Sequence, residues 1–116
     1  MDLKLAPVLS EYLREVLLKA AINREPVYTY GEVHRGIGKT TALVSFAKEL
    51  GFTVIVPNNR LALDLRLKTG YENIVGENQV KDQPIATKFV YDDGVDPTYL
   101  KKTYGIKVIT GFKNIR

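Results

Sequence analysis

A short glycine-containing stretch, Arg35-Gly36-Ile37-Gly38-Lys39-Thr40-Thr41, holds the residues of this chain that are best suited to chemistry. Gly36 and Gly38 carry no side chain, so the backbone N–H groups around them can come close to an anion. The ammonium group of Lys39 can reach the outer phosphates of a nucleotide, and the hydroxyl of Thr40 can bind its Mg²⁺. We therefore predict that residues 35–41 form a phosphate-binding loop; the alternative is a chance glycine-rich turn.

Two carboxylates, Asp92 and Asp93, come directly after the apolar run Phe89-Val90-Tyr91. An apolar run of this kind favours a buried strand, and its end is where a parallel sheet presents ligand-binding groups. Asp-Asp-Gly is also ordinary turn sequence, so a simple turn is the alternative interpretation. The glycine-containing loop upstream favours a metal-binding or water-orienting role for this pair.

The spacing of apolar residues predicts the elements that must position these groups. An amphipathic N-terminal helix is expected over residues 8–22, with further helices over residues 39–50, 60–68 and 97–104. Strands are expected over residues 27–30, 52–56, 86–91 and 106–110, with a weaker one over residues 71–75. This alternation predicts an α/β fold of three layers, in which helices flank a parallel sheet within a single minimal domain over residues 1–116.

Composition excludes several classes of protein. The chain has 116 residues, 45% of them hydrophobic and 26% charged, which is typical of a globular domain. It has no cysteine and one histidine, His34, so a disulfide framework and a multi-histidine zinc site are excluded. Neither a membrane span nor a signal peptide is visible, and we expect a cytoplasmic location without membrane contact.

The formal net charge of +4 is concentrated near the end of the chain. Residues 96–116 hold one carboxylate, Asp96, and five basic side chains, which are Lys101, Lys102, Lys107, Lys113 and Arg116. Such a segment is either a surface for nucleic-acid phosphates or a solvated helix face. The turn Asn58-Asn59-Arg60 has the same two interpretations, phosphate contact or a helix cap.

Taken together, these motifs resemble the P-loop NTPases, with residues 35–41 similar to a Walker A loop and residues 88–93 similar to a Walker B strand. The resemblance is to a minimal core of a helicase or a phage DNA-packaging ATPase, and it covers residues 27–111. The full Walker A pattern has a glycine where this chain has Val33, which indicates a reshaped approach to the loop.

The resemblance implies ATP and Mg²⁺ as cofactors. It implies that Lys39 neutralises phosphate charge, that Thr40 and Asp92 hold Mg²⁺, and that Asp93 orients the attacking water. Arg35 either touches a phosphate oxygen or is a solvated loop residue. By analogy with helicase-like ATPases, Thr110 at the tip of a strand would sense the γ-phosphate; the alternative is a threonine with no such role, since a threonine before a glycine is commonplace.

The leading functional hypothesis is a nucleotide-binding protein that hydrolyses ATP weakly or with a partner's help, coupled to a nucleic-acid transaction. The small size of the chain would fit a phage-encoded protein that acts in the host cytoplasm. The alternative is a non-enzymatic module of the same fold that docks on and regulates a partner protein, or that forms a homo-oligomer. A small-molecule or nucleotide kinase ranks last, because no arginine-rich lid stands out.

Overall fold

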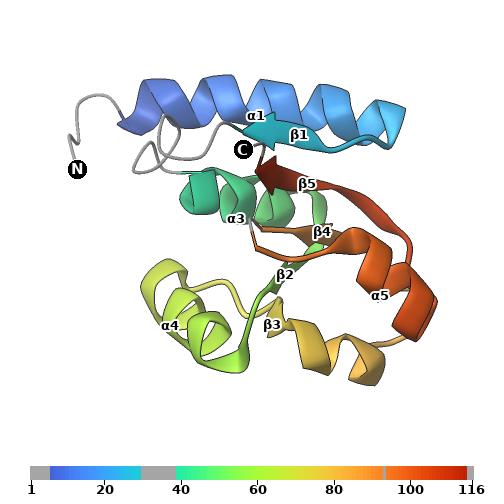
Figure 1. Cartoon of the computed structure of the whole chain (residues 1–116). Coiled ribbons are helices and arrows are strands. Elements are labelled where there is room, and N and C mark those ends of the chain that lie inside the picture. Colours follow the sequence, from blue (N-terminus) through green and yellow to red (C-terminus); the bar gives the residue numbers. More distant parts are fainter. Residues whose placement is uncertain (1–5, 30–38, 93, 115–116) are drawn as a thin grey trace.

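The computed structural model describes residues 6–29, 39–92 and 94–114, and of residues 6–13, 28, 29, 39, 113 and 114 it describes the backbone alone (Figure 1). The helices are α1 (Ala6–Asn23), α3 (Lys39–Leu50), α4 (Asn59–Thr69), α5 (Pro97–Tyr104) and the 3₁₀ helix η1 (Glu77–Asp82). The strands are β1 (Val27–Thr29), β2 (Thr53–Val56), β3 (Ile74–Gly76), β4 (Phe89–Tyr91) and β5 (Val108–Asn114). All five strands pair in parallel, in the order β1-β5-β4-β2-β3. The predicted α/β fold with a parallel sheet is confirmed.

The sheet is covered on both faces, because alternate residues of its inner strands enter two separate cores. In β2, Val54 and Val56 join the first core, whereas Ile55 joins the second. In β4, Val90 lies in the first core and its neighbours Phe89 and Tyr91 lie in the second. This alternation explains why β2 and β4 read as continuous apolar runs in the sequence.

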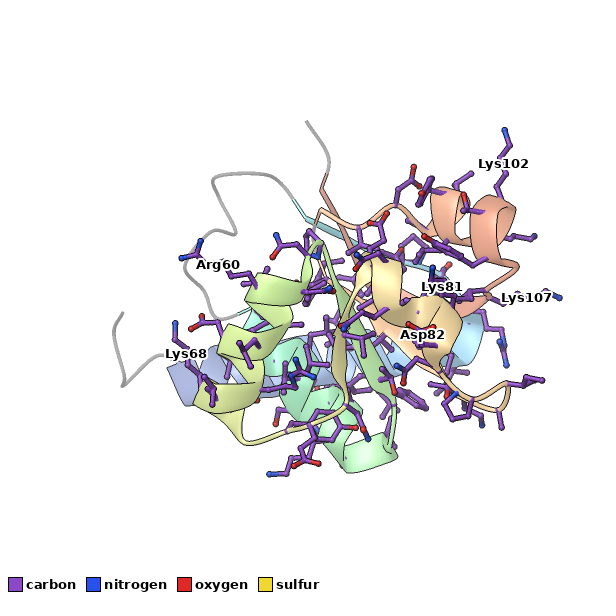
Figure 2. All side chains as sticks on the ribbon, turned by 90° about the horizontal axis from the view of Figure 1, so that it is seen from below. Arg60, Lys68, Lys81, Asp82, Lys102 and Lys107 are labelled. Atoms are coloured by element: carbon purple, nitrogen blue, oxygen red, sulfur yellow. The ribbon has the colours of Figure 1, made fainter. Side chains whose placement is uncertain are left out.

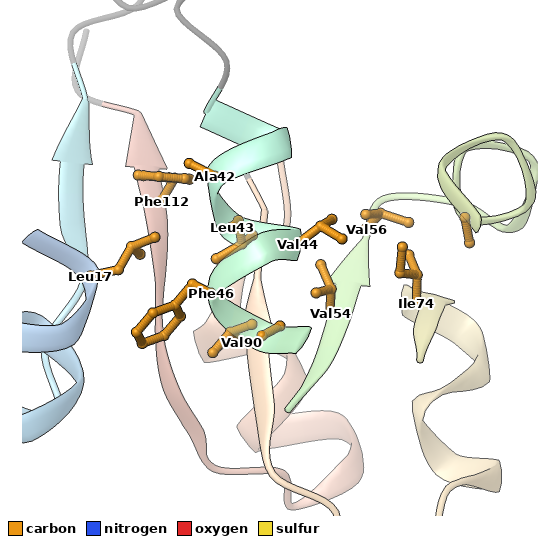
Figure 3. Packing of buried hydrophobic residues seen from close by; sticks show 12 residues of the cluster. Leu17, Ala42, Leu43, Val44, Phe46, Val54, Val56, Ile74, Val90 and Phe112 are labelled. Atoms are coloured by element: carbon orange, nitrogen blue, oxygen red, sulfur yellow. The ribbon is translucent and has the colours of Figure 1, made fainter. Parts of the chain in front are cut away.

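The first core lies between the sheet and the helices α1, α3 and α4 (Figure 3). Helix α3 lies across the sheet in this view and supplies more residues of this core than any other element, among them Leu43, Val44 and Phe46. The second core is closed by α5 and η1, through Leu100 and Val80. The molecule therefore has the predicted three layers, with helices on both faces of the sheet.

Helix α1 was predicted to have one apolar face. Leu17 and Ala20 are buried against the rest of the domain, whereas Ile22 is exposed. The side chains of residues 6–13, in the first part of α1, lie outside the described part. Among the described helices, none is long and apolar enough to cross a membrane.

The sequence signals for helix ends proved accurate for α5 and α4. Asp96 caps α5 by accepting a hydrogen bond from the Thr98 backbone N–H at 2.9 Å, and Gly105 ends it in the left-handed conformation. Asn58 caps α4 by accepting from the Leu61 N–H at 2.8 Å, and Gly70 ends it in the same way. For Asn58 the helix-cap interpretation is therefore correct, because its side-chain oxygen is used within the fold.

Candidate functional site

The candidate site is the edge of the sheet at which the strands have their carboxyl ends. Strand β1 ends at Thr29, and α3 begins at Lys39 after the segment that was predicted to bind phosphate. Strand β4 ends at Tyr91, directly before Asp92. Because all the strands are parallel, the end of β1 and the end of β4 face the same edge. This is the arrangement that a ligand site in an open α/β sheet requires.

Thr40 and Asp92 meet at this edge. The hydroxyl of Thr40 donates a hydrogen bond to Oδ2 of Asp92 at 2.8 Å, although the two residues are 52 positions apart in the sequence. Asp92 is buried, with 5% of its surface exposed, and Thr40 is half-buried. The two residues that were predicted to hold Mg²⁺ are thus brought into direct contact.

The backbone of Asp92 is fixed by the strands around it. Its N–H donates to the Ile55 carbonyl at 2.9 Å and so prolongs the ladder between β4 and β2. Its carbonyl accepts a hydrogen bond from the Val95 N–H at 3.3 Å, which starts the turn toward α5. The carboxylate is therefore presented from a rigid part of the sheet, as a preorganised binding site requires.

Thr40 is likewise fixed in place, because the helix α3 that carries it is packed into the first core. Thr40 is the second residue of α3, and the following residues Ala42, Leu43 and Val44 are all buried in the first core. The other end of α3 is tied to α1, because Arg14 donates two hydrogen bonds to the Glu49 carboxylate, at 2.7 and 2.5 Å. This ion pair holds the pKa of Glu49 below its usual value.

The start of α3 also favours an anion. The first N–H groups of a helix have no partner within it, and its dipole places partial positive charge there. No acidic residue lies in the first turn of α3, so this charge is not offset within the helix. The exposed Thr41 adds a second hydroxyl next to Thr40. A phosphate group at this point would meet N–H and O–H donors together.

Thr40 and Asp92 offer only oxygen atoms, which is the ligand type that Mg²⁺ prefers. Mg²⁺ commonly takes one or two protein oxygens and completes its shell with water and substrate phosphates. The described residues contain no group of three or more His, Cys, Asp or Glu side chains that could hold a metal. Thr40 and Asp92 could therefore supply two oxygen ligands to such an ion.

Several predicted site residues lie outside the described part of the structure. These are Arg35, Gly36, Ile37, Gly38 and Asp93. Lys39 is described by its backbone alone, as the first residue of α3. The roles assigned to these residues from the sequence stay predictions, and only Thr40, Thr41 and Asp92 are placed with their side chains.

The prediction for Thr110 is wrong. Strand β5 continues four residues past Thr110, to Asn114, so Thr110 is inside the strand and not at its tip. Its buried hydroxyl donates to the Glu25 carbonyl at 2.7 Å, ahead of the start of β1 and so toward the amino-terminal edge. Gly111, directly after the strand predicted over residues 106–110, pairs with Tyr91 of β4 within the sheet.

Asn114 is the residue that sequence reasoning missed. It pairs with Thr29 at the carboxyl end of β5, between the end of β1 and the rest of the sheet. A polar residue two positions before the end of the chain carries no local signal of a strand end. Only the register of β5 against β1 places it at the candidate site.

Comparison with known proteins finds no matching family model, no matching curated protein and no matching solved structure for this chain. The function is therefore inferred from the residues and from the geometry of the site alone.

Proposed function

We propose that this chain binds a nucleoside triphosphate, ATP, together with Mg²⁺ at the edge where Thr40 meets Asp92, and that it hydrolyses the nucleotide slowly. The observation that carries this proposal is the 2.8 Å hydrogen bond between Thr40 and Asp92. A hydroxyl following a glycine-rich loop and a carboxylate following a buried strand are the two groups that this chemistry needs next to each other.

The strand order supports the same proposal. Strand β5 separates β1 from β4, so the strand before the loop and the strand before Asp92 lie about 10 Å apart, or two strand spacings. The hydroxyl of Thr40, near the start of α3, donates its hydrogen bond to the carboxylate of Asp92, directly after β4. The space beyond the end of β5 lies between the ends of β1 and β4, and we expect the phosphates to lie there.

In this proposal each residue has a separate task. The backbone of residues 36–38 and the ammonium group of Lys39 bind the phosphates and offset their charge, and Arg35 adds a bidentate contact. Thr40 and Asp92 would hold Mg²⁺, which when bound offsets charge on the outer phosphates. Asp93 accepts a hydrogen bond from the attacking water and orients it toward the γ-phosphorus. Catalysis would come mainly from positioning and charge neutralisation.

The test is calorimetric titration of MgATP into the wild-type protein, Lys39→Ala and Lys48→Ala. Lys48 is a matched control, because it is an exposed lysine in the last turn of the same helix. We expect binding to be lost in Lys39→Ala and retained in Lys48→Ala. Equal affinity in all three proteins would refute the nucleotide site. Titration with GTP in parallel measures the base preference.

Hydrolysis needs its own measurement. We expect the wild-type protein to release phosphate from ATP faster than Lys39→Ala does, and Asp93→Asn to bind ATP but release phosphate more slowly than the wild type. If nucleotide binds but phosphate release does not exceed that of Lys39→Ala, the enzymatic part of the proposal fails. The chain would then be a nucleotide-binding module that acts through a partner.

A further inference from the structure

A basic groove runs along the opposite edge of the sheet, where the strands have their amino ends. It consists of two adjoining hollows of about 420 and 490 Å³, which share Ile106 and Lys107 as a common wall. Ile106 and Lys107 directly precede β5, and Arg24 lies shortly before β1. Arg24, Ile106 and Lys107 therefore lie on the amino-terminal side of the strands, whereas Asp92 follows the carboxyl end of β4.

Four basic side chains line this groove. Lys81 and Lys107 line the first hollow, and Arg24, Lys101 and Lys107 line the second. All four are exposed, and within the described part of the chain none of them forms an ion pair. No aspartate or glutamate lines either hollow. Their charge is consequently available to a partner.

Two carboxylates lie near the groove without lining its two hollows, and one of them, Glu25, lines a third hollow that shares Arg24 with the second. Asp82 and Glu25 follow Lys81 and Arg24 in the chain, but neither lines the two hollows. The carboxylate of Asp96 is occupied as the cap of α5. Figure 2 shows Lys81, Lys102 and Lys107 on the side of the molecule formed by α5 and η1, away from Arg60 and Lys68.

The other lining residues suit a chain of phosphates with bases attached. Gln83 and Thr87 in the first hollow and Thr98 in the second supply neutral hydrogen-bond groups. Tyr104 adds an aromatic ring to the wall of the first hollow, and this ring packs edge-to-face with that of Tyr99, with ring centroids 6.1 Å apart. Cations along a groove together with an aromatic ring are the usual means of binding single-stranded nucleic acid.

We propose that this groove binds single-stranded nucleic acid, with Arg24, Lys81, Lys101 and Lys107 contacting successive backbone phosphates. The proposal goes beyond nucleotide binding at Thr40 and Asp92 and does not depend on it, since the two sites share no residue. An acidic polypeptide is the competing occupant, because it offers the same sign of charge without bases.

The experiment is fluorescence anisotropy with a labelled oligothymidylate of about 15 nucleotides, near the upper site size of such grooves, in the absence of ATP and Mg²⁺. Four phosphate contacts predict that the logarithm of the association constant falls with the logarithm of salt concentration with a slope of about −3. Raising the salt from about 50 to 200 mM should then weaken binding roughly 50-fold.

The test variant is Lys101→Ala/Lys107→Ala, and the control is Lys48→Ala/Lys68→Ala. Both remove two exposed lysines, but those of the control lie on α3 and α4, away from the groove. At about 50 mM salt the test variant should bind roughly 50-fold more weakly than the wild type, and its salt slope should fall to about half. Urea unfolding of both variants shows whether either has lost stability.

Two results would overturn the proposal. One is equal loss of affinity in the test and control variants, which would indicate a response to net charge and not to the groove. The other is competition by poly-glutamate as effective as that by unlabelled oligothymidylate at equal charge concentration, which would favour an acidic polypeptide. Because ATP is absent throughout, failure of the protein to bind oligothymidylate would not count against the nucleotide site. Equal ATP affinity of the wild type and Lys39→Ala, which would refute the nucleotide site, would not count against the groove.

Discussion

The contact between Thr40 and Asp92 can be tested without any ligand, through the stability of the protein. In Thr40→Val the side chain keeps its shape but loses the hydroxyl that donates to Oδ2 of Asp92. In Thr40→Ser the hydroxyl remains and only a methyl group is lost. The two variants therefore separate the hydrogen bond from the packing of the side chain.

The expected loss follows from the burial of Asp92. Its carboxylate is almost fully shielded from water, so water cannot replace the donor that Thr40→Val removes. A hydrogen bond to a charged group contributes about 1.5–3 kcal/mol, and we expect Thr40→Val to lose an amount in that range. Thr40→Ser should lose less than about 1 kcal/mol, since one methyl group of a half-buried side chain is removed.

Thermal unfolding followed by circular dichroism converts these energies into shifts of Tm. For the 116 residues of this chain the unfolding entropy is about 0.24 kcal/mol/K, so each kcal/mol lowers Tm by about 4 °C. Thr40→Val should melt about 6–12 °C below the wild type, and Thr40→Ser within about 4 °C of it. The measurement is made with a chelator present, so that bound metal does not add to the stability.

A Tm of Thr40→Val equal to that of Thr40→Ser would refute this reasoning. It would mean that the hydroxyl does not contact Asp92 in solution and that the two halves of the candidate site are not held together. A double-mutant cycle with Asp92→Asn provides the matched control, because the effect of Thr40→Val should shrink when the carboxylate charge is absent.

Three further predictions follow from other contacts. Gly111→Ala should lower the free energy of unfolding in urea by about 1–3 kcal/mol or more, because its Cβ would lie 2.3 Å from the Tyr91 carbonyl oxygen. Unchanged stability would contradict the register of β4 and β5. Burial, together with the charge of Asp96, raises the pKa of Glu77. The charged form of Glu77 is thus disfavoured in the fold, so Glu77→Gln should raise Tm at neutral pH and have no effect once the pH falls below the unfolded value of 4.5; a lower Tm at neutral pH would oppose this. Arg14 lowers the pKa of Glu49, so this group contributes stability above its unfolded value of 4.5 that is lost as the pH falls through its lower folded value. Glu49→Gln should therefore lower Tm at neutral pH and converge with the wild type in acid, and a pH-independent difference would exclude the ion pair as its cause.

Much of the fold was predictable because its signals are local. The bounds of α3 and α5 were predicted to the residue, since α3 has an apolar periodicity and α5 has a capping Asp96 and a terminal Gly105 in the sequence. Strand β2 was predictable because four consecutive apolar or β-branched residues face two cores. The 3₁₀ helix η1 was not, because its polar sequence is typical of a turn.

The candidate site was predictable in part. Asp92 and Thr40 were chosen because each follows a local signal, a buried strand or a glycine-rich loop, and the structure brings them together. Thr110 and Asn114 were not predictable, because the end of β5 is set by its register against β1 and β4. The glycine inside β5 is explained only by Tyr91, whose ring and carbonyl leave no room for a side chain at Gly111.

The basic groove could not be predicted from the sequence. Arg24 lies at the end of α1, more than seventy residues before Lys101 and Lys107, and only the parallel pairing of β1 with β5 brings these residues to the same edge. The excess positive charge of the last twenty residues was visible in the sequence. That Arg24 lines the same hollow as Lys101 and Lys107 follows only from the fold.

The most direct test of the central claim is a crystal structure of the chain with Mg²⁺ and a non-hydrolysable ATP analogue. We expect phosphate density against residues 36–40, with Mg²⁺ between the hydroxyl of Thr40 and the carboxylate of Asp92. Nucleotide bound elsewhere, or a Thr40–Asp92 contact that excludes both phosphate and metal at saturating concentrations, would contradict it.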